Sequence, residues 1–343
     1  MKVVTARGNN YRLSGQLNPF QEDLQIHLID WKWKNLTPDP GQFRGEEYDA
    51  LLPDSMAGAF AHIYPPIHAE LKRHHQGNPF RIHKFFDHMA SSQAANINLF
   101  LPILMSPNAS AILGALRPDL KSIAKNELDH GCCVEFWGEN FSRRQRTAGP
   151  LNDKSKVAGT DADLAIAYVN RDGELCLWLI EHKLTEAEFT TCGGFRSPGR
   201  KARHDCGRTF SAILKNKNTC YYHDVNRYRY WEITEQNQTF FKNHGSYGSC
   251  PFRNGMNQLW RNQLLAVGIE QDPQSPFKHV HFSVVKHPGN HHLDKTVAEY
   301  RRLIGNNPKF TVFTSADVIN AAQQVNDPSL AAWIQWYKDL YRI

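Results

Sequence analysis

Residues 160–186, TDADLAIAYVNRDGELCLWLIEHKLTE, decide the fold of this chain. The first arm, residues 163–169, is apolar and ends at residues 170–173, Asn-Arg-Asp-Gly, where Asp and Gly favour a type I turn closed by a left-handed glycine. The second arm, residues 175–180, is continuously apolar, which suits a strand buried on both faces better than so short an amphipathic helix. The stretch therefore predicts a β-hairpin near the centre of a sheet.

The turn decides which residues of the two arms face each other. In a three-residue turn with a glycine bulge, Asn170 pairs with Glu174, and Asp163 then lies opposite Glu181. A two-residue turn would shift every pairing by one and set Asp163 against Ile180. We favour the first register, which predicts two acids face to face.

Opposed acids need a partner. Directly opposed residues have Cβ atoms about 4.5 to 5.5 Å apart, and two like charges there repel unless a cation or a shared proton lies between them. Lys183 points to the same face as Glu181, and Asp161 would lie opposite Lys183, so the choice between Asp161 and Asp163 depends on the register; we prefer Asp163. The alternative is an ordinary salt-bridged strand end, since an E-x-K tripeptide is common. Burial of the strand favours a metal site, because buried acids are usually paired or metal-bound.

These residues resemble the Asp…Glu-x-Lys phosphodiesterases, the PD-(D/E)xK nuclease superfamily, which includes restriction endonucleases and RecB-like repair nucleases. More narrowly, the chain resembles a bacterial family of restriction endonucleases. The resemblance spans roughly residues 80–343, although Ala162 stands where the superfamily name has a proline. The segments that carry it are Ser-Ser-Gln at 91–93, continuing to residue 100, Thr-x-x-Asp at 160–163, Ile-Glu-x-Lys-x-x-Glu at 180–186 and Gln-Leu-x-Arg-Asn at 258–262.

The resemblance implies an α/β fold with a restriction-endonuclease-like core, a mixed central sheet in the order α-β-β-β-α-β, with N-terminal and C-terminal helical extensions. Residues 1–79 are expected to form a wrapping extension, and residues 80–343 a nuclease-like domain with a cysteine-containing insertion at 187–255. Apolar patterning adds strands at 279–286 and 310–313. The expected helices lie near 62–75, 80–98, 256–266 and 293–304, with two closing helices from about 316 and 329.

The resemblance also implies hydrolysis of phosphodiester bonds in DNA. Asp163 and Glu181 would bind Mg²⁺, or Mn²⁺ in its place, with the backbone carbonyl of His182 as a further ligand. The His182 imidazole should point to the other face and pack there. Lys183 would orient the attacking water and offset charge on the phosphate, and beside two carboxylates it should stay protonated.

Supporting residues are less specific. Glu135, or Glu127 in an expected helix before it, would supply a further carboxylate, with an ordinary surface residue as the alternative. On the predicted helix at 256–266, the resemblance places Gln258 and Arg261 towards the site, whereas a solvated helix face would explain them equally well.

Charge is consistent with a nucleic-acid partner. The net charge is +6 with a pI near 8.9, and basic clusters occur at residues 72–75, 143–146 and 200–204. Each cluster alone is commonly a solvated loop, but together they favour DNA over a small phosphate ester as substrate. The main alternative is a nucleic-acid-binding protein of the same fold with little catalysis, which uses the cysteine insertion as a binding module. The resemblance also allows a homodimer and a methyltransferase or helicase partner.

The chain has seven cysteines, an odd number, and no evident export signal, and both observations argue against a disulfide framework. The apolar runs, such as residues 99–105, are too short to cross a bilayer, so we expect a cytoplasmic protein. Four cysteines in the insertion could hold Zn²⁺ or an iron-sulfur cluster, although no C-x-x-C pair is present and unlinked thiols are the alternative. These four are Cys192, Cys206, Cys220 and Cys250.

Overall fold

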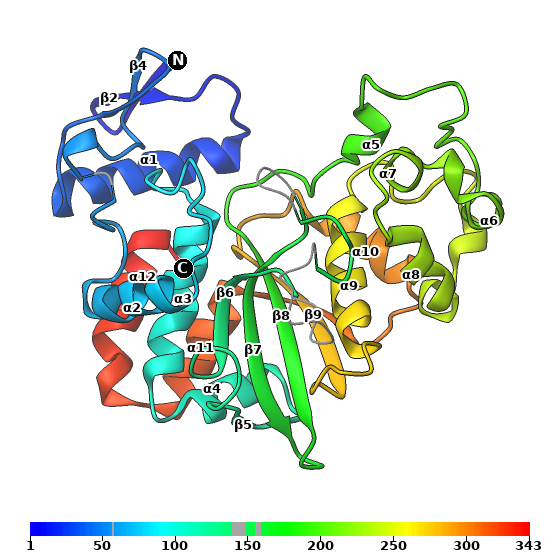
Figure 1. The fold of residues 1–343 in the computed structure, drawn as a ribbon. Helices are drawn as coiled ribbons and strands as arrows, with labels where there is room; N and C mark the ends of the chain where they lie inside the picture. Colours follow the sequence, from blue (N-terminus) through cyan, green and yellow to red (C-terminus); the bar gives the residue numbers. More distant parts are fainter. Residues whose placement is uncertain (57, 139–148, 155–158) are drawn as a thin grey trace.

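The computed structural model of the chain describes residues 1–56, 58–138, 149–154 and 159–343, with a mixed sheet at its centre (Figure 1). The strands follow the order β10-β9-β8-β7-β5, and β6 also pairs with β7. β7 is antiparallel to its neighbours, whereas β8, β9 and β10 run parallel. The predicted mixed central sheet is thus confirmed. Its strands are β5 (Leu120–Ile123), β6 (Cys132–Phe136), β7 (Ala162–Asn170), β8 (Leu175–Lys183), β9 (His279–Lys286) and β10 (Phe310–Thr314).

The central hairpin has the predicted register. The Asn170 N–H donates to the Glu174 carbonyl at 2.9 Å, and Gly173 takes the left-handed conformation with φ 83°. Leu164 pairs with Ile180, so the preceding residue of β7, Asp163, stands opposite Glu181. The three-residue turn is therefore confirmed, and the alternative register is wrong.

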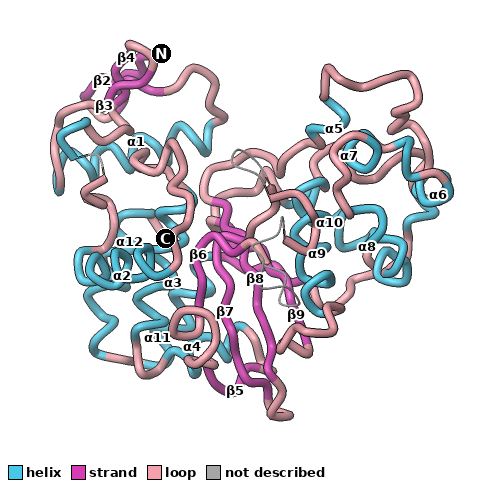
Figure 2. The backbone as a smooth tube through the Cα atoms, in the orientation of Figure 1, coloured by secondary structure: helices cyan, strands magenta, loops and turns pink. Residues whose placement is uncertain are grey.

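Helices cover both faces of the sheet (Figure 2). Even-numbered residues of β8, such as Trp178 and Ile180, belong to one core, and odd-numbered residues, such as Leu177 and Leu179, belong to the other. Burial on both faces explains why this strand is a continuous apolar run. The first core includes α1 (Pro19–Asn35), α2 (His68–Gly77), α3 (Ser92–Met105), α4 (Ala109–Leu116), α11 (Ser315–Val325) and α12 (Ala331–Tyr341), and the second includes α6 (Phe210–Lys215), α8 (Tyr230–Gln236), α9 (Asn257–Glu270) and α10 (Asp294–Leu303).

The N-terminal segment places two small hairpins against α1, where Tyr11 and Trp33 stack with ring centroids 5.2 Å apart. It also reaches the end of β8, since the Gln21 amide donates to the Thr185 carbonyl at 2.7 Å. These hairpins are β1 (Lys2–Ala6) with β2 (Asn9–Leu13), and β3 (Gly41–Phe43) with β4 (Glu46–Tyr48).

One predicted helix begins later than expected. Residues 80–91 form a loop, and α3 begins only at Ser92, because the Ser91 side chain accepts a hydrogen bond from the Ala94 N–H and caps the first turn. The other predicted helices occur near their expected positions, although the one expected at 62–75 starts as α2 at His68.

The insertion contains short helices that pack on α9 through aromatic rings. Phe252 and Trp260 stack with centroids 4.1 Å apart, and Trp231 lies against both rings. Its remaining helices are α5 (Gly193–Arg196) and α7 (Tyr221–Asp224). Within the described ranges, no helix combines the length and apolar character needed to cross a bilayer.

Candidate active site

The hairpin brings its two acids and its lysine to one place. Lys183 Nζ lies 2.8 Å from Glu181 Oε1, and both side chains are nearly buried. Asp163 Oδ2 accepts a hydrogen bond from the His182 N–H at 2.6 Å. Burial and the nearby Glu181 carboxylate raise the pKa of Asp163 well above its ordinary value. The arrangement gathers acidic side chains beside the Lys183 ammonium group.

Lys183 is protonated in this setting, as the sequence predicted. Burial lowers the pKa of an ammonium group, but the carboxylates of Glu181, Glu186 and Asp163 outweigh burial and raise the pKa of Lys183. Glu186 Oε1 lies 3.8 Å from Lys183 Nζ. The raised pKa favours the charged form of Lys183.

Glu135 joins the cluster from β6. Its neighbours pair with residues flanking Asp163, so Glu135 lies beside Asp163, and its left-handed φ of 53° marks an irregular strand end. It is 3% exposed, and its Oε1 has no hydrogen-bond partner among the described residues. Asp161 lies near Glu135, and burial together with this neighbour raises the pKa of Asp161 well above its ordinary value. The alternative of a surface residue is therefore wrong for Glu135, whereas Glu127 lies in a turn between β5 and β6 instead of the expected helix.

Helix α9, on one face of the sheet, fixes Glu181 through two side-chain amides. The Gln258 amide donates to Glu181 Oε1 and the Asn262 amide to Oε2, both at 2.7 Å. The two amides are four residues apart and so lie on one helix face. Gln258 is thus placed where the sequence analysis expected it.

Arg261 lies off that face and has a different partner. Its guanidinium donates to the Gly159 carbonyl at 3.1 Å and to Thr160 Oγ1 at 3.0 Å. Thr160 in turn donates to Asp153 at 2.5 Å, and Tyr230 donates to the same carboxylate at 2.6 Å. Arg261 therefore fixes the segment that leads into β7 rather than touching the acids.

Helix α3 supports the cluster from the opposite face. The Asn96 amide donates to the Asp163 carbonyl at 3.1 Å. Gln93 accepts from the His83 N–H and donates to the Arg81 carbonyl, both at 2.9 Å, and so holds the loop before α3. That loop places His83 Nε2 3.5 Å from Glu135, whose hydrogen bond raises the pKa of His83.

Sequence reasoning gave no role to Glu186 or His83. Glu186 stood within the matched Ile-Glu-x-Lys-x-x-Glu segment, which was a signal for it, whereas nothing local marks His83.

The His182 imidazole lies on the α3 face, as predicted, since β8 side chains alternate between the two cores. Complete burial lowers its pKa to about 4, so the ring is neutral. The role of its backbone carbonyl as a metal ligand stays a prediction.

The acids are not arranged as a formed metal site. No three His, Cys, Asp or Glu side chains of residues 1–56, 58–138, 149–154 and 159–343 are placed as ligands of one ion. Glu181 has both oxygens bonded to α9 amides and one also near Lys183. Asp163 is turned to a backbone amide. A cation would have to compete with these partners.

The basic cluster at residues 72–75 is largely used within the protein. Arg73 binds the carboxylates of Glu70 and Asp129. His74 lies 2.6 Å from Asp129, and burial lowers its pKa. This cluster gives no support to a phosphate-binding role.

The cluster at residues 200–204 is similar. Arg200 donates to two backbone carbonyls, and Arg203 binds Asp224. The third cluster, residues 143–146, lies outside the described residues. The argument for DNA from basic clusters therefore weakens in the described part of the chain.

The four insertion cysteines come together although they are far apart in sequence. Burial and the nearby Cys220 and Cys206 raise the pKa of the Cys192 thiol to about 12. The Cys250 N–H donates to the Cys206 carbonyl at 3.2 Å. All are free thiols, and they do not form metal-ligand geometry in the part of the chain described here.

Comparison with known proteins gives one match. A family model described as Restriction Endonuclease associating with ARP matches residues 25–342. No curated protein and no solved structure matches the chain.

Proposed function

The chain belongs to the family of restriction endonucleases associating with ARP, and we propose on that premise that it is a metal-dependent DNA endonuclease with Asp163, Glu181 and Lys183 at its centre. The observation that carries the proposal is the hairpin register, which places Asp163 opposite Glu181. In the same hairpin, Lys183 Nζ lies 2.8 Å from Glu181 Oε1. The order α3, α4, β5, β6, β7, β8, α9, β9, interrupted by the insertion helices before α9, supports a restriction-endonuclease-like core that departs from the α-β-β-β-α-β succession by the additional α4 and β5.

The donor set fits a hard divalent cation such as Mg²⁺ or Mn²⁺. The candidate ligands are carboxylate oxygens of Asp163, Glu181, Glu135 and Asp161, with the His182 carbonyl as a further donor. The buried Glu135 Oε1, which has no hydrogen-bond partner among the described residues, is an oxygen that a cation could use as a ligand. Binding a cation through Asp161 requires this acid to ionise, whereas Glu181 can keep its contacts with α9, because Oε2 accepts from Asn262 and has a second lone pair.

Bound metal would supply an activated water and polarise a phosphoryl oxygen. The remaining work belongs to the side chains of this protein. Lys183, kept protonated by three carboxylates, offsets the charge that develops on the phosphate. Gln258 and Asn262 each donate to one oxygen of Glu181 and so fix the orientation of this carboxylate within the cluster.

Cleavage of DNA tests the proposal. The purified chain would be incubated with supercoiled plasmid, linear duplex and single-stranded DNA in the presence of Mg²⁺, Mn²⁺ or EDTA. Glu181→Gln and Lys183→Ala should each reduce cutting at least about 100-fold, since each removes a group at the centre. Matched controls are Glu174→Gln, at the turn end of the hairpin, and Lys278→Ala, directly before β9, where the Lys278 N–H donates to the Leu175 carbonyl.

Two outcomes contradict the proposal. Cutting that persists undiminished in both central variants removes the assigned residues. Tight DNA binding with no cutting under any metal condition favours the alternative of a nucleic-acid-binding protein on this fold.

A further inference from the structure

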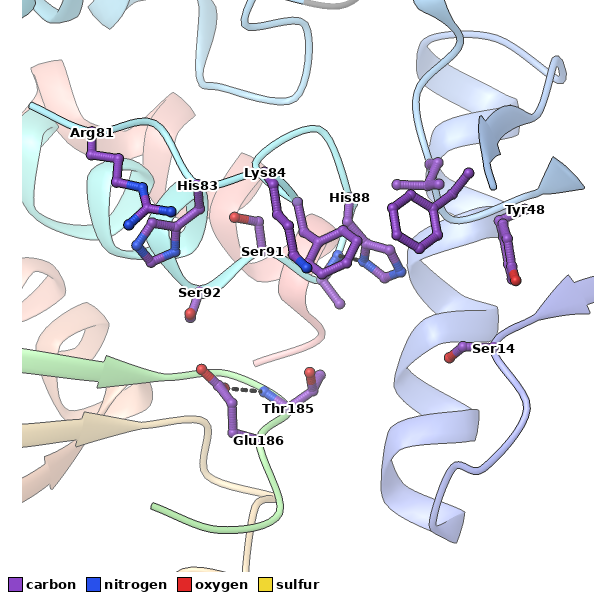
Figure 3. A pocket seen from close by; sticks show the side chains of 14 residues that line it. Ser14, Tyr48, Arg81, His83, Lys84, His88, Ser91, Ser92, Thr185 and Glu186 are labelled. Atoms are coloured by element: carbon purple, nitrogen blue, oxygen red, sulfur yellow. Dashed lines mark hydrogen bonds between the residues drawn. The ribbon is translucent and has the colours of Figure 1, made fainter. Parts of the chain in front are cut away.

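A cavity of about 650 Å³ adjoins the candidate site and is bounded by three segments that are distant in sequence (Figure 3). Its walls come from the N-terminal hairpins, from the loop before α3 and from Thr185 and Glu186 after β8. Glu186 lines the cavity and lies 3.8 Å from Lys183. His83 also lines it and lies 3.5 Å from Glu135. The cavity therefore approaches the carboxylate cluster through two of its lining residues, Glu186 and His83.

Two aromatic rings of the cavity wall each have a cationic side chain beside them. The Phe43 and Phe85 rings meet edge to face with centroids 5.2 Å apart, and Phe85 is 41% exposed. The Arg44 guanidinium lies 5.2 Å from the Phe43 ring, and Lys84 Nζ lies 4.5 Å from the Phe85 ring. An exposed ring beside a cavity offers a surface for stacking, and aromatic rings interleaved with cations suit a base and its phosphate.

Most residues of the lining are uncharged, and the charged ones are mainly basic. Figure 3 shows Arg81, His83 and Lys84 on the loop that faces Glu186 across the cavity. Glu186 is the single acid among the lining residues, and its charge is already engaged by Lys183. Charge complementarity thus favours an anionic ligand with a flat aromatic part.

We propose that this cavity receives one nucleobase extruded from the DNA duplex, next to the phosphate that is cut. The inference rests on the proposed nuclease function and deepens it. The volume lies within the range of about 300 to 1,000 Å³ for sites that enclose small ligands, whereas a paired duplex does not fit inside such a space. Stacking on Phe85 offsets the cost of unpairing the base.

Binding of mismatched DNA tests the inference. A series of duplexes would be made, each with one mismatch at a different base pair. The dissociation constant of each duplex would be measured by fluorescence anisotropy, with Ca²⁺ in place of Mg²⁺ so that the DNA is bound without being cut. An extruding protein binds more tightly, by about 10-fold, when the mismatch occupies the extruded position, because the pairing is already weakened. Phe85→Ala should abolish that preference, because it weakens binding of the mismatched duplex by about 10-fold more than binding of the matched duplex.

The control is Met105→Ala, which truncates a similarly exposed apolar side chain at the other end of α3. Lys84→Gln is a second cavity variant that needs no change in the aromatic wall, and it should weaken the same preference. Thermal unfolding of each variant verifies that it is folded.

The outcomes separate the two proposals. If Glu181→Gln abolishes cutting but no mismatch position is preferred, or Phe85→Ala keeps the preference, the base-binding inference is wrong and the nuclease assignment stands. If free deoxynucleoside monophosphates bind in a Phe85-dependent manner while mismatches have no effect, the occupant is a free nucleotide and the inference is also wrong. If Glu181→Gln cuts as wild type does, the nuclease assignment fails irrespective of the cavity.

Discussion

Asp161 lies beside Glu135, and burial together with this neighbour raises the pKa of Asp161 well above its ordinary value, in a cluster that also includes Asp163 and Glu181. Such a cluster is costly to fold, because neighbouring acids resist ionisation. A divalent cation bound during function would offset this loss of folding stability, and active sites are often less stable than they could be for this kind of reason.

Replacing Asp161 by Asn should stabilise the metal-free protein at pH 8. The folded-state pKa of Asp161 is raised, so the unfolded chain releases this proton at a lower pH than the folded one does, and stability decreases as pH rises through that interval. We expect a gain of about 1 kcal/mol that shrinks towards pH 4, measured by thermal unfolding in EDTA. Asp172→Asn in the exposed turn is the control, and a less stable Asp161→Asn at pH 8 contradicts the prediction.

Magnesium should raise the unfolding temperature of the wild-type chain. A ligand that binds only the folded state at about 100 times its dissociation constant adds about 2.7 kcal/mol. Asp163→Asn should lose most of this gain, because it removes a candidate ligand, whereas Glu174→Gln should keep it. An unchanged response in Asp163→Asn would place the cation elsewhere, and no response in wild type would contradict the metal site.

Replacing Gln258 by Met should reduce cleavage about 10- to 100-fold by releasing one oxygen of Glu181. Because Gln258 positions a ligand, a higher magnesium concentration should restore part of the rate, which a folding defect would not allow. Gln274→Met, in the exposed loop after α9, should have no effect. Loss of activity that magnesium does not restore would argue against a positioning role.

Replacing Gln93 by Ala should release the loop that carries Arg81 and His83, since two hydrogen bonds are lost from a nearly buried amide. The expected cost is about 1 to 3 kcal/mol. Trypsin should then cut faster after Arg81 or Lys84, as followed by mass spectrometry. Equal proteolysis of Gln93→Ala and an exposed control, Gln323→Ala, would contradict this role.

The metal staple proposed for the insertion cysteines predicts about one equivalent of zinc, or a brown iron-sulfur cluster, in protein purified without chelator. Cys206→Ser and Cys250→Ser should each lose the metal and unfold at a lower temperature. Metal analysis and thiol titration provide the measurement. The metal staple is contradicted if the purified protein contains neither zinc nor iron and its thiols become reactive one by one as it unfolds. These cysteines would then be simply buried.

The candidate centre could be predicted largely from local sequence. The turn at residues 170–173 fixes the register of both arms, and the strand period of two then fixes which side chains share a face. Asp163, Glu181 and Lys183 follow from those two rules, since all three lie in one hairpin. The apolar run at residues 175–180 likewise predicted a strand covered on both faces.

Tertiary structure decided the residues around that centre. Glu135 and His83 reach it from other segments, and Arg261 turns away to Thr160 although Asn262, its neighbour in the chain, reaches Glu181. Such contacts depend on how helices and strands pack against each other, which no local pattern encodes. The basic clusters show the same limit, because distant carboxylates decide whether an arginine is available. By itself the sequence determined the hairpin and its charged pair through short-range backbone geometry, while long-range packing determined what surrounds them.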